Sequence, residues 1–331
     1  GLGDVYKRQG LLFQVDFAAS QEIYQYERMW PALSQPWYFV QPRGIAKGPS
    51  GHIYVVDTQR CVIEKFRSDG FFVTRWGNFG AGDGEFDHPQ GVCVDAEGNV
   101  YVSDAYNHRI QKFTSDGEFL LKWGSQGPGD DQFFLPCGIA ADSYGNIYVV
   151  DVSLARIQKF NSSGTFITKW GQSGTDAGAF DNPYAIAVSL SNENYIYVAD
   201  SRNNRIQKFN TDGDFISQWG IYGSRDGEFR QPTGIAIDQE GYVYVADMYN
   251  LRIQKFSEEG LFITTWGNEL GGDGWPIGGS GDGEFDFTQS TGKIGIAIGP
   301  EGHVCVGDPE RIQKFDLNGN FITAWTSAGS D

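Results

Sequence analysis

A motif of about 34 residues recurs along this chain at a nearly constant spacing, and this recurrence limits the possible folds more than any other feature. Residues 91–124 read GVCVDAEGNVYVSDAYNHRIQKFTSDGEFLLKWG, and residues 138–171 read GIAADSYGNIYVVDVSLARIQKFNSSGTFITKWG. Repeats of about 20 to 50 residues are typical of solenoids and propellers, so the chain is expected to be one array of similar units. The unit occurs six times, with marker aspartates at Asp57, Asp104, Asp151, Asp200, Asp247 and Asp308.

Each unit contains four short segments of strand-like composition. In the fifth unit these are Gly234–Asp238, Tyr244–Asp247, Arg252–Phe256 and Phe262–Gly267. Their β-branched and aromatic residues, bounded by Gly, Asn, Asp and Ser, are typical of strands. No stretch keeps helical apolar periodicity over the ten or more residues that a helix needs. Four antiparallel strands at this period predict one propeller blade, with the apolar first strand at the centre and the fourth at the exposed outer edge.

The repeated pattern can be written P-x-G-I/V-A-V-D, then G-N-x-Y-V-A-D, then N-x-R-I-Q-K-F. It resembles the NHL repeat over roughly residues 43–326. This resemblance implies an all-β fold, a six-bladed β-propeller of four-stranded antiparallel blades. Three repeats depart from the pattern: Val62 replaces the arginine in the first, Leu154 replaces the loop asparagine in the third, and the sixth is shortened. The blades are expected at about residues 43–77, 90–124, 137–171, 184–220, 233–267 and 294–326.

The two ends of the chain match the repeat poorly. Residues 1–11 are interpreted as a non-native or disordered leader, residues 12–326 as a single propeller domain and residues 327–331 as a tail. Residues 12–30 have the features of a degenerate third and fourth strand. A seventh blade, completed by sequence beyond residue 331, is therefore an alternative to the favoured count of six. The chain is also compatible with being part of a longer polypeptide.

Charge and cysteine content narrow the functional classes. The chain has 25 Lys and Arg against 42 Asp and Glu, a net charge of −17, which argues against binding to the phosphates of a nucleic acid. No apolar run approaches the length of a membrane span. The cysteines show no metal-binding spacing and are expected to be free thiols, with Cys93 and Cys305 on buried strands. The four cysteines are Cys61, Cys93, Cys137 and Cys305.

No constellation of residues indicates catalysis or a cofactor. Calcium needs six to eight oxygen ligands, whereas each DGEF-like loop, such as Asp83–Phe86, supplies only two carboxylates. Nucleophile-elbow, phosphate-loop and paired-carboxylate motifs are absent from the sequence. We therefore predict no metal, no cofactor and no catalytic residue. The histidines, which are not expected to converge on a zinc ion, are His52, His88, His108 and His303.

Binding residues are expected on one face of the propeller. The loops between second and third strands and the crossovers between blades should share this face. The Asp–Arg pairs, such as Asp104 with Arg109, recur in nearly every unit and are assigned to the fold. The residue before the first-strand glycine instead varies, as Arg43, Gln90, Cys137, Tyr184, Thr233 and Ile294. Because Tyr and Arg dominate binding hot spots, the predicted ligand-binding residues are Arg43, Arg60, Tyr106, Tyr184, Arg202 and Tyr249.

These features favour a non-catalytic binding or scaffold propeller that recognises a protein, peptide or glycan ligand on its loop face. The resemblance keeps one alternative open, a metal-dependent hydrolase or lyase similar to propeller lactonases or the amidating lyase. Recognition of RNA, known for some NHL propellers, is disfavoured by the acidic charge, and a purely architectural role remains a further alternative. The composition favours an extracytoplasmic or cell-surface location.

Overall fold

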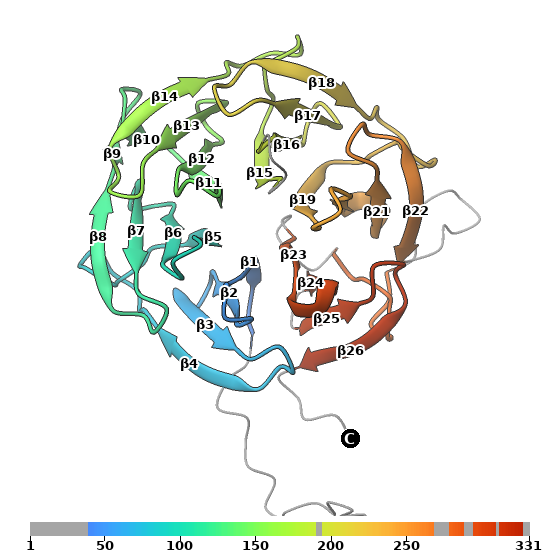
Figure 1. Ribbon diagram of the computed structural model, residues 1–331, viewed down its shortest axis with the longest axis horizontal. Helices are drawn as coiled ribbons and strands as arrows, with labels where there is room; N and C mark the ends of the chain where they lie inside the picture. The colour runs from blue at the N-terminus through green and yellow to red at the C-terminus, as the bar shows by residue number, and fades with distance from the viewer. Residues whose placement is uncertain (1–38, 190–193, 268–277, 288–293, 309–310, 327–331) are drawn as a thin grey trace, which may run out of the picture.

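Six four-stranded sheets form a closed ring in the computed structural model, which describes residues 39–189, 194–267, 278–287, 294–308 and 311–326 (Figure 1). Each of these six sheets is antiparallel, and its strands follow chain order from the centre outwards. The predicted six-bladed, all-β propeller is therefore confirmed. Residues 12–30, which raised the alternative of a seventh blade, lie outside the described residues. No helix in the described part of the chain has the length and apolar character that a membrane crossing requires.

The strands occupy equivalent positions in all six blades. The innermost strands are β1 (Pro42–Lys47), β5 (Pro89–Val94), β11 (Pro136–Ala141), β15 (Pro183–Val188), β19 (Pro232–Ile237) and β23 (Ile296–Ile298). The second strands are β2 (Ile53–Asp57), β6 (Val100–Asp104), β12 (Ile147–Asp151), β16 (Ile196–Asp200), β20 (Val243–Asp247) and β24 (Val304–Asp308). The third strands are β3 (Val62–Phe66), β7 (Arg109–Phe113), β13 (Arg156–Phe160), β17 (Arg205–Phe209), β21 (Arg252–Phe256) and β25 (Arg311–Phe315).

The outer strands complete each blade and differ from the inner ones in exposure. They are β4 (Phe72–Trp76), β8 (Phe119–Trp123), β14 (Phe166–Trp170), β18 (Phe215–Trp219), β22 (Phe262–Gly267) and β26 (Phe321–Thr326). Their side chains mostly alternate between half-buried and exposed, whereas nearly every residue of the second and third strands is buried. The predicted outer edge is therefore confirmed. The remaining short elements are β9 (Ser125–Gln126), β10 (Gln132–Phe133) and the 3-10 turns η1 (Met248–Asn250) and η2 (Pro300–Gly302).

Glycine allows the innermost strands to approach one another closely. These strands contact each other in the order β1, β5, β11, β15, β19 and β23, and β23 contacts β1 to close the ring. A Cβ on Gly91 would lie 2.3 Å from the carbonyl oxygen of Cys137, and a Cβ on Gly138 would lie 2.5 Å from that of Tyr184. At these two positions only a residue without a Cβ permits such a close approach. The equivalent residue of the fourth blade is Ala185, whereas the other five blades have glycine.

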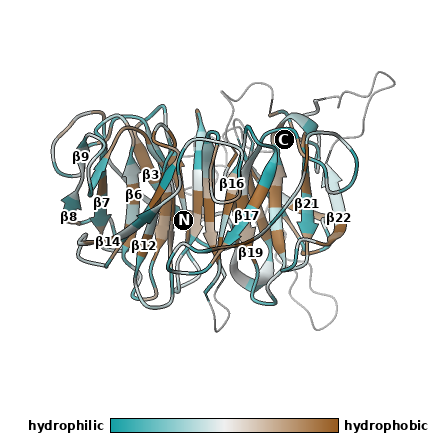
Figure 2. Ribbon diagram, turned by 90° about the horizontal axis from the view of Figure 1, so that it is seen from above, coloured by the Kyte–Doolittle hydropathy of each residue, from teal (hydrophilic) through white to brown (hydrophobic). Residues whose placement is uncertain are grey.

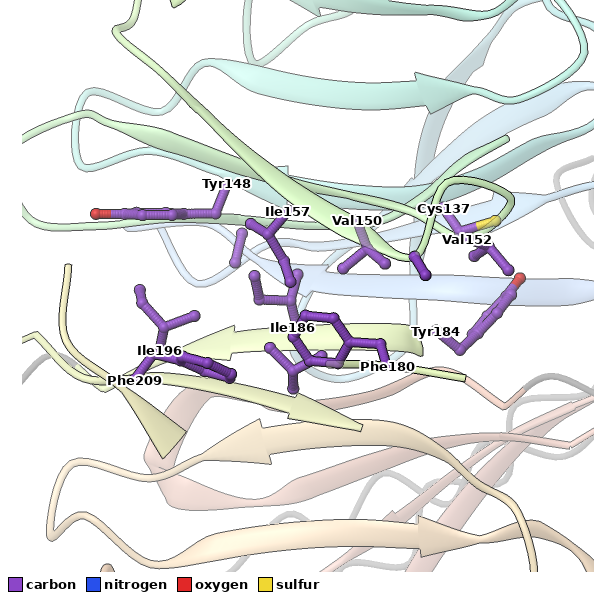
Figure 3. Packing of buried hydrophobic residues seen from close by; sticks show 13 residues of the cluster. Cys137, Tyr148, Val150, Val152, Ile157, Phe180, Tyr184, Ile186, Ile196 and Phe209 are labelled. Atoms are coloured by element: carbon purple, nitrogen blue, oxygen red, sulfur yellow. The ribbon is translucent and has the colours of Figure 1, made fainter. Parts of the chain in front are cut away.

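The hydrophobic core lies between neighbouring blades. One cluster, shown in Figure 3, joins Tyr148 and Ile157 of the third blade to Ile196 and Phe209 of the fourth. Aromatic rings continue this packing outwards, because the outer-strand Trp170 lies with its ring centroid 6.1 Å from that of Phe209 in the next blade. Figure 2 shows the strands running between two faces of a disc, where the loops gather. All four cysteines are buried and form no disulfide with each other.

The recurrent aspartate and arginine hold the crossover loops in place. In the second blade, Arg109 donates from Nε to Asp104 at 2.7 Å and from its terminal nitrogens to the carbonyl oxygens of Ala81, Gly82 and Glu85. Burial raises the pKa of Asp104, although these hydrogen bonds favour its ionised form. The same bonds recur in the fourth and fifth blades, which supports the assignment of these pairs to the fold.

The first blade replaces this arrangement. Val62 occupies the arginine position, and Glu64 occupies the position that is glutamine in the other five blades. Arg60 donates from Nη1 to Glu64 Oε1 at 2.9 Å, while Oε2 is buried without a hydrogen-bond partner among the described residues. The Glu64 side chain is fully buried, and burial raises its pKa to about 7.

Candidate functional site

Two sets of loops lie on the same face of the disc, as predicted. In the third blade, Pro136 pairs with Asp151, so the crossover that enters β11 lies beside the loop that leaves β12. Hydrogen bonds join the equivalent loops in the second blade, where Asn107 Nδ2 donates to the carbonyl oxygen of Gly80 at 2.8 Å. We call this side the loop face. The opposite side, formed by turns between first and second strands, is called the turn face.

A small cavity opens where the six innermost strands meet. Its volume is about 90 Å³, and all six blades contribute to its lining. Six aliphatic side chains form one part of the wall, Ile45, Val92, Ile139, Ile186, Ile235 and Ile296. The other part consists of the six residues that precede the first-strand glycine or its alanine replacement, Arg43, Gln90, Cys137, Tyr184, Thr233 and Ile294. The six variable positions of the repeat therefore converge, and we call the space that they line the central cavity.

Gln90 connects three blades across the central cavity. Its side-chain oxygen accepts hydrogen bonds from Arg43 Nη1 and from the Tyr184 hydroxyl, the latter at 2.6 Å. Its amide nitrogen donates to the carbonyl oxygen of His88 at 3.0 Å. Because a backbone carbonyl can only accept, this contact orients the amide with its oxygen towards Arg43 and Tyr184. Two of the predicted binding residues are thus brought together by a third residue that was not predicted.

Tyr184 enters the cavity as a hydrogen-bond donor. It is buried, and Figure 3 places it near Cys137 of the neighbouring blade, at the end of the cluster away from the Tyr148 hydroxyl. Burial raises the pKa of the Tyr184 phenol well above its ordinary value. The hydroxyl therefore remains protonated at neutral pH and can donate to Gln90.

Thr233 and Arg43 complete the polar lining. The Thr233 side chain is 4 % exposed, and its hydroxyl has no hydrogen-bond partner among the residues that the structure describes. A buried hydroxyl without a partner is destabilising by about 1–3 kcal/mol, so such groups are uncommon in folded proteins. Arg43 is the only charged residue in the described lining of the cavity. The central cavity therefore combines one positive charge with an unsatisfied hydroxyl.

The other two predicted arginines lie outside the central cavity. Arg60 forms the ion pair with Glu64 described above, so it has a structural role in the first blade. Arg202 lies on the loop of the fourth blade with 64 % of its side chain exposed, and its Nη1 is 3.8 Å from Asp181 Oδ1. Neither residue lines the cavity, and each belongs to the loop of its own blade.

The two remaining predicted tyrosines are exposed on loops after the second strands. Tyr106 is 54 % exposed and stacks on His88 with ring centroids 4.5 Å apart. Tyr249 is 45 % exposed and lies in the fifth blade. The crossovers carry further exposed aromatic residues that were not among the predicted binding residues. These residues are Phe79, Phe134 and Tyr222.

The acidic loops and the histidines form ion pairs and hydrogen bonds, each with its own neighbouring residues. Asp83 of one DGEF loop pairs with Lys122 at 2.6 Å, and Glu85 accepts a hydrogen bond from the Gly82 nitrogen at 2.8 Å. His88 pairs with Asp87 at 2.6 Å. Within the described ranges of the chain, no three His, Cys, Asp or Glu residues gather closely enough to hold a metal ion.

Comparisons with known proteins agree with this architecture. Residues 86–113 match the NHL repeat, and residues 175–267 match a 6-bladed beta-propeller family. No curated protein matches the sequence.

Solved structures resemble the chain at low sequence identity. A streptogramin B lyase structure has a TM-score of 0.58 at 15% identity, covering 87% of this chain and 95% of that one. A gluconolactonase from Xanthomonas campestris has a TM-score of 0.58 at 14% identity, with coverage of 84% and 86%. A protein of unknown function from Bacteroides thetaiotaomicron has a TM-score of 0.62 at 17% identity, with coverage of 85% and 70%. Such identities bear on the fold alone, and the chain is a six-bladed β-propeller with a match to the NHL repeat in its second blade.

Proposed function

We propose that this propeller is a non-catalytic binding protein that recognises a peptide segment of a protein ligand with its loop face. One observation carries the proposal: six side chains that differ from blade to blade converge on one small cavity within an otherwise repetitive ring. The fold uses the same buried residues in nearly every blade, at the Asp, Arg and Gln positions of the repeat. The variable position holds an arginine, an amide, a thiol, a phenol, a hydroxyl or an aliphatic chain in different blades. The fold therefore does not fix its residue type, which allows these side chains to be selected for ligand binding.

The surface around the central cavity has the composition of an interaction site. Tyr106 and Tyr249 project from loops on this face, and the crossovers add Phe79 and Tyr222, all of them exposed. Aromatic residues are enriched in protein interfaces because they bury a large area at a small cost in side-chain entropy. Tyr106 belongs to the second blade and Tyr249 to the fifth, on opposite sides of the ring, so a ligand that contacts both would pass over the cavity at the centre.

The proposal is tested by peptide binding to the immobilised protein. Synthetic peptides of random sequence, with free and amidated C-termini, are passed over the native protein and over the double variant Tyr106→Ala and Tyr249→Ala. The control is Tyr144→Ala, which removes an even more exposed aromatic ring from the turn face, where Tyr144 is 77 % exposed. We expect retained peptides to bind the double variant at least about tenfold more weakly, and the control unchanged.

Two outcomes would contradict the proposal. One is the recovery of peptides that bind the double variant as tightly as the native protein, because the loop face would then not be their site. The other is stoichiometric calcium or zinc in the purified protein together with an EDTA-sensitive melting temperature. That result would favour a metal-dependent hydrolase or lyase instead.

A further inference from the structure

We infer that the central cavity binds a carboxylate carried on a short aliphatic stem. This inference rests on the proposed function and names the part of the ligand that enters the cavity. Its basis is the charge, the hydrogen-bond donors and the shape of the described lining.

The polar side chains of the lining carry more hydrogen-bond donors than acceptors. Arg43 supplies a guanidinium group with a permanent positive charge. The one strong side-chain acceptor nearby, Gln90 Oε1, already receives hydrogen bonds from Arg43 and Tyr184. The Gln90 amide nitrogen is used by the carbonyl oxygen of His88. A ligand group that only accepts hydrogen bonds and carries negative charge therefore matches this lining, whereas an ammonium group does not.

Thr233 gives independent support for a ligand oxygen. Thr233 lines the cavity from the fifth blade, and its buried hydroxyl has no hydrogen-bond partner in the described part of the chain. The other polar groups of the lining are organised around Gln90, in the second blade. An oxygen atom of a bound group is the natural partner for the Thr233 hydroxyl, because this hydroxyl can both donate and accept.

The apolar wall favours a carboxylate on a carbon stem over an inorganic anion such as phosphate. On the scale where one water needs roughly 10–15 Å³, a cavity of about 90 Å³ holds roughly six to nine water molecules. The six aliphatic side chains of the wall, among them Ile45 and Ile235, suit a stem of a few carbon atoms. A planar carboxylate also matches the fork of a guanidinium group. The carboxylate can belong to the C-terminus of a peptide, to a Glu or Asp side chain, or to a free short-chain acid.

The first arm of the test measures propionate binding to the full chain by calorimetry and by thermal melting. Native protein should bind propionate saturably, and n-propanol and inorganic phosphate should bind at least tenfold more weakly. Arg43→Gln should weaken propionate binding at least tenfold. The matched control is Arg67→Gln, which removes an exposed arginine that follows β3 in the same blade and lies outside the cavity lining, and it should leave the affinity unchanged.

A second variant distinguishes the loss of a binding group from misfolding of the protein. Thr233→Val keeps the size of the side chain and removes only the hydroxyl, and it should weaken propionate binding severalfold without loss of the native melting transition. Propionate binding that Arg43→Gln and Thr233→Val both leave unchanged would overturn the inference. So would equal binding of phosphate, or the absence of saturable binding by the native protein.

The second arm identifies the source of the carboxylate. Peptides retained by the loop face are compared with free and amidated C-termini, and with each Glu or Asp changed to Gln or Asn. A loss of affinity on amidation assigns the carboxylate to the C-terminus, and a loss on neutralising a side chain assigns it to that residue. Peptides that bind equally well in every form and to Arg43→Gln would overturn the inference but leave the proposed function intact. Propionate binding without any retained peptide would support the inference and contradict the proposed function.

Discussion

Replacing Glu64 by glutamine tests the physical account of the buried network in the first blade. In the second blade, Gln111 donates from Nε2 to Asp104 at 3.1 Å and to the carbonyl oxygen of Glu85 at 2.7 Å. An ionised Glu64 has no hydrogen to donate, and the neighbouring Asp57 carboxylate repels it. The substitution Glu64→Gln restores the residue type of the other blades and removes a buried charge.

The magnitude follows from the raised pKa of Glu64. Its shift from an ordinary value of 4.5 to about 7 corresponds to a cost of about 3 kcal/mol for the ionised form, at ~1.4 kcal/mol per tenfold change in proton affinity. Because the folded state holds this proton more tightly, the cost is absent below pH 4.5. It grows between pH 4.5 and about 7 and is complete above that range.

The attraction of Arg60 is already included in this raised pKa, because Arg60 favours the ionised form and lowers the value. Glu64→Gln should therefore be more stable than the native protein by about 3 kcal/mol at pH 8 and about equally stable at pH 4.5. Arg75, the second arginine near Glu64, lies opposite it on β4 and is unchanged in both proteins.

Denaturant unfolding of both proteins at pH 4.5 and pH 8 measures the difference directly. The reverse substitution in the second blade, Gln111→Glu, is the matched control and should destabilise the protein more at pH 8 than at pH 4.5. The reasoning is refuted if Glu64→Gln is no more stable than the native protein at pH 8. A gain of equal size at both pH values would also refute it, because the gain would then not come from the buried charge.

Three further predictions concern the packing of the ring. Gly138→Ala should destabilise the protein by about 2 kcal/mol or more in chemical denaturation. The reason is that the new Cβ would lie 2.5 Å from a backbone carbonyl oxygen of the next blade. Ala185→Gly, at the equivalent position of the fourth blade, should destabilise the protein less than half as much. Ser201→Ala should lower stability by about 1–2 kcal/mol, since the buried Ser201 hydroxyl donates to the carbonyl oxygen of Pro232 at 2.6 Å across two blades; an unchanged unfolding midpoint would contradict this. Burial raises the pKa of the Cys305 thiol, so a thiol reagent at pH 8 should label it only after unfolding, and rapid labelling of the native protein would show that the core is open.

The blades and their order could be predicted from the sequence because the contacts that define them are local. Each strand pairs with the next strand along the chain, and the turns between them, such as Asp142–Asn146, are short and rich in turn-forming residues. The resemblance to the NHL repeat added the ring and its six blades. The variable positions before each first-strand glycine could also be read from the repeat.

The site was only partly predictable. Arg43 and Tyr184 were predicted as binding residues, and both line the central cavity. The prediction that they bind a ligand stays a prediction. Gln90 and Thr233 were recognised as variable but were not selected, because a preference for Tyr and Arg in hot spots gives no weight to an amide or a hydroxyl. Arg60 was selected on its residue type, and its partner Glu64 could have been noticed as the one change from glutamine at that position of the repeat.

By itself, the sequence determined the strands, the turns and the number of repeated units, since these depend on residues close together in the chain. Only the tertiary structure decided which side chains meet at the axis. Gln90 contacts Arg43 from 47 residues away and Tyr184 from 94 residues away, on strands that no hairpin connects. These contacts depend on how closely the innermost strands approach and on the closure of the ring. Both are properties of all six blades packed together, and no single repeat contains them.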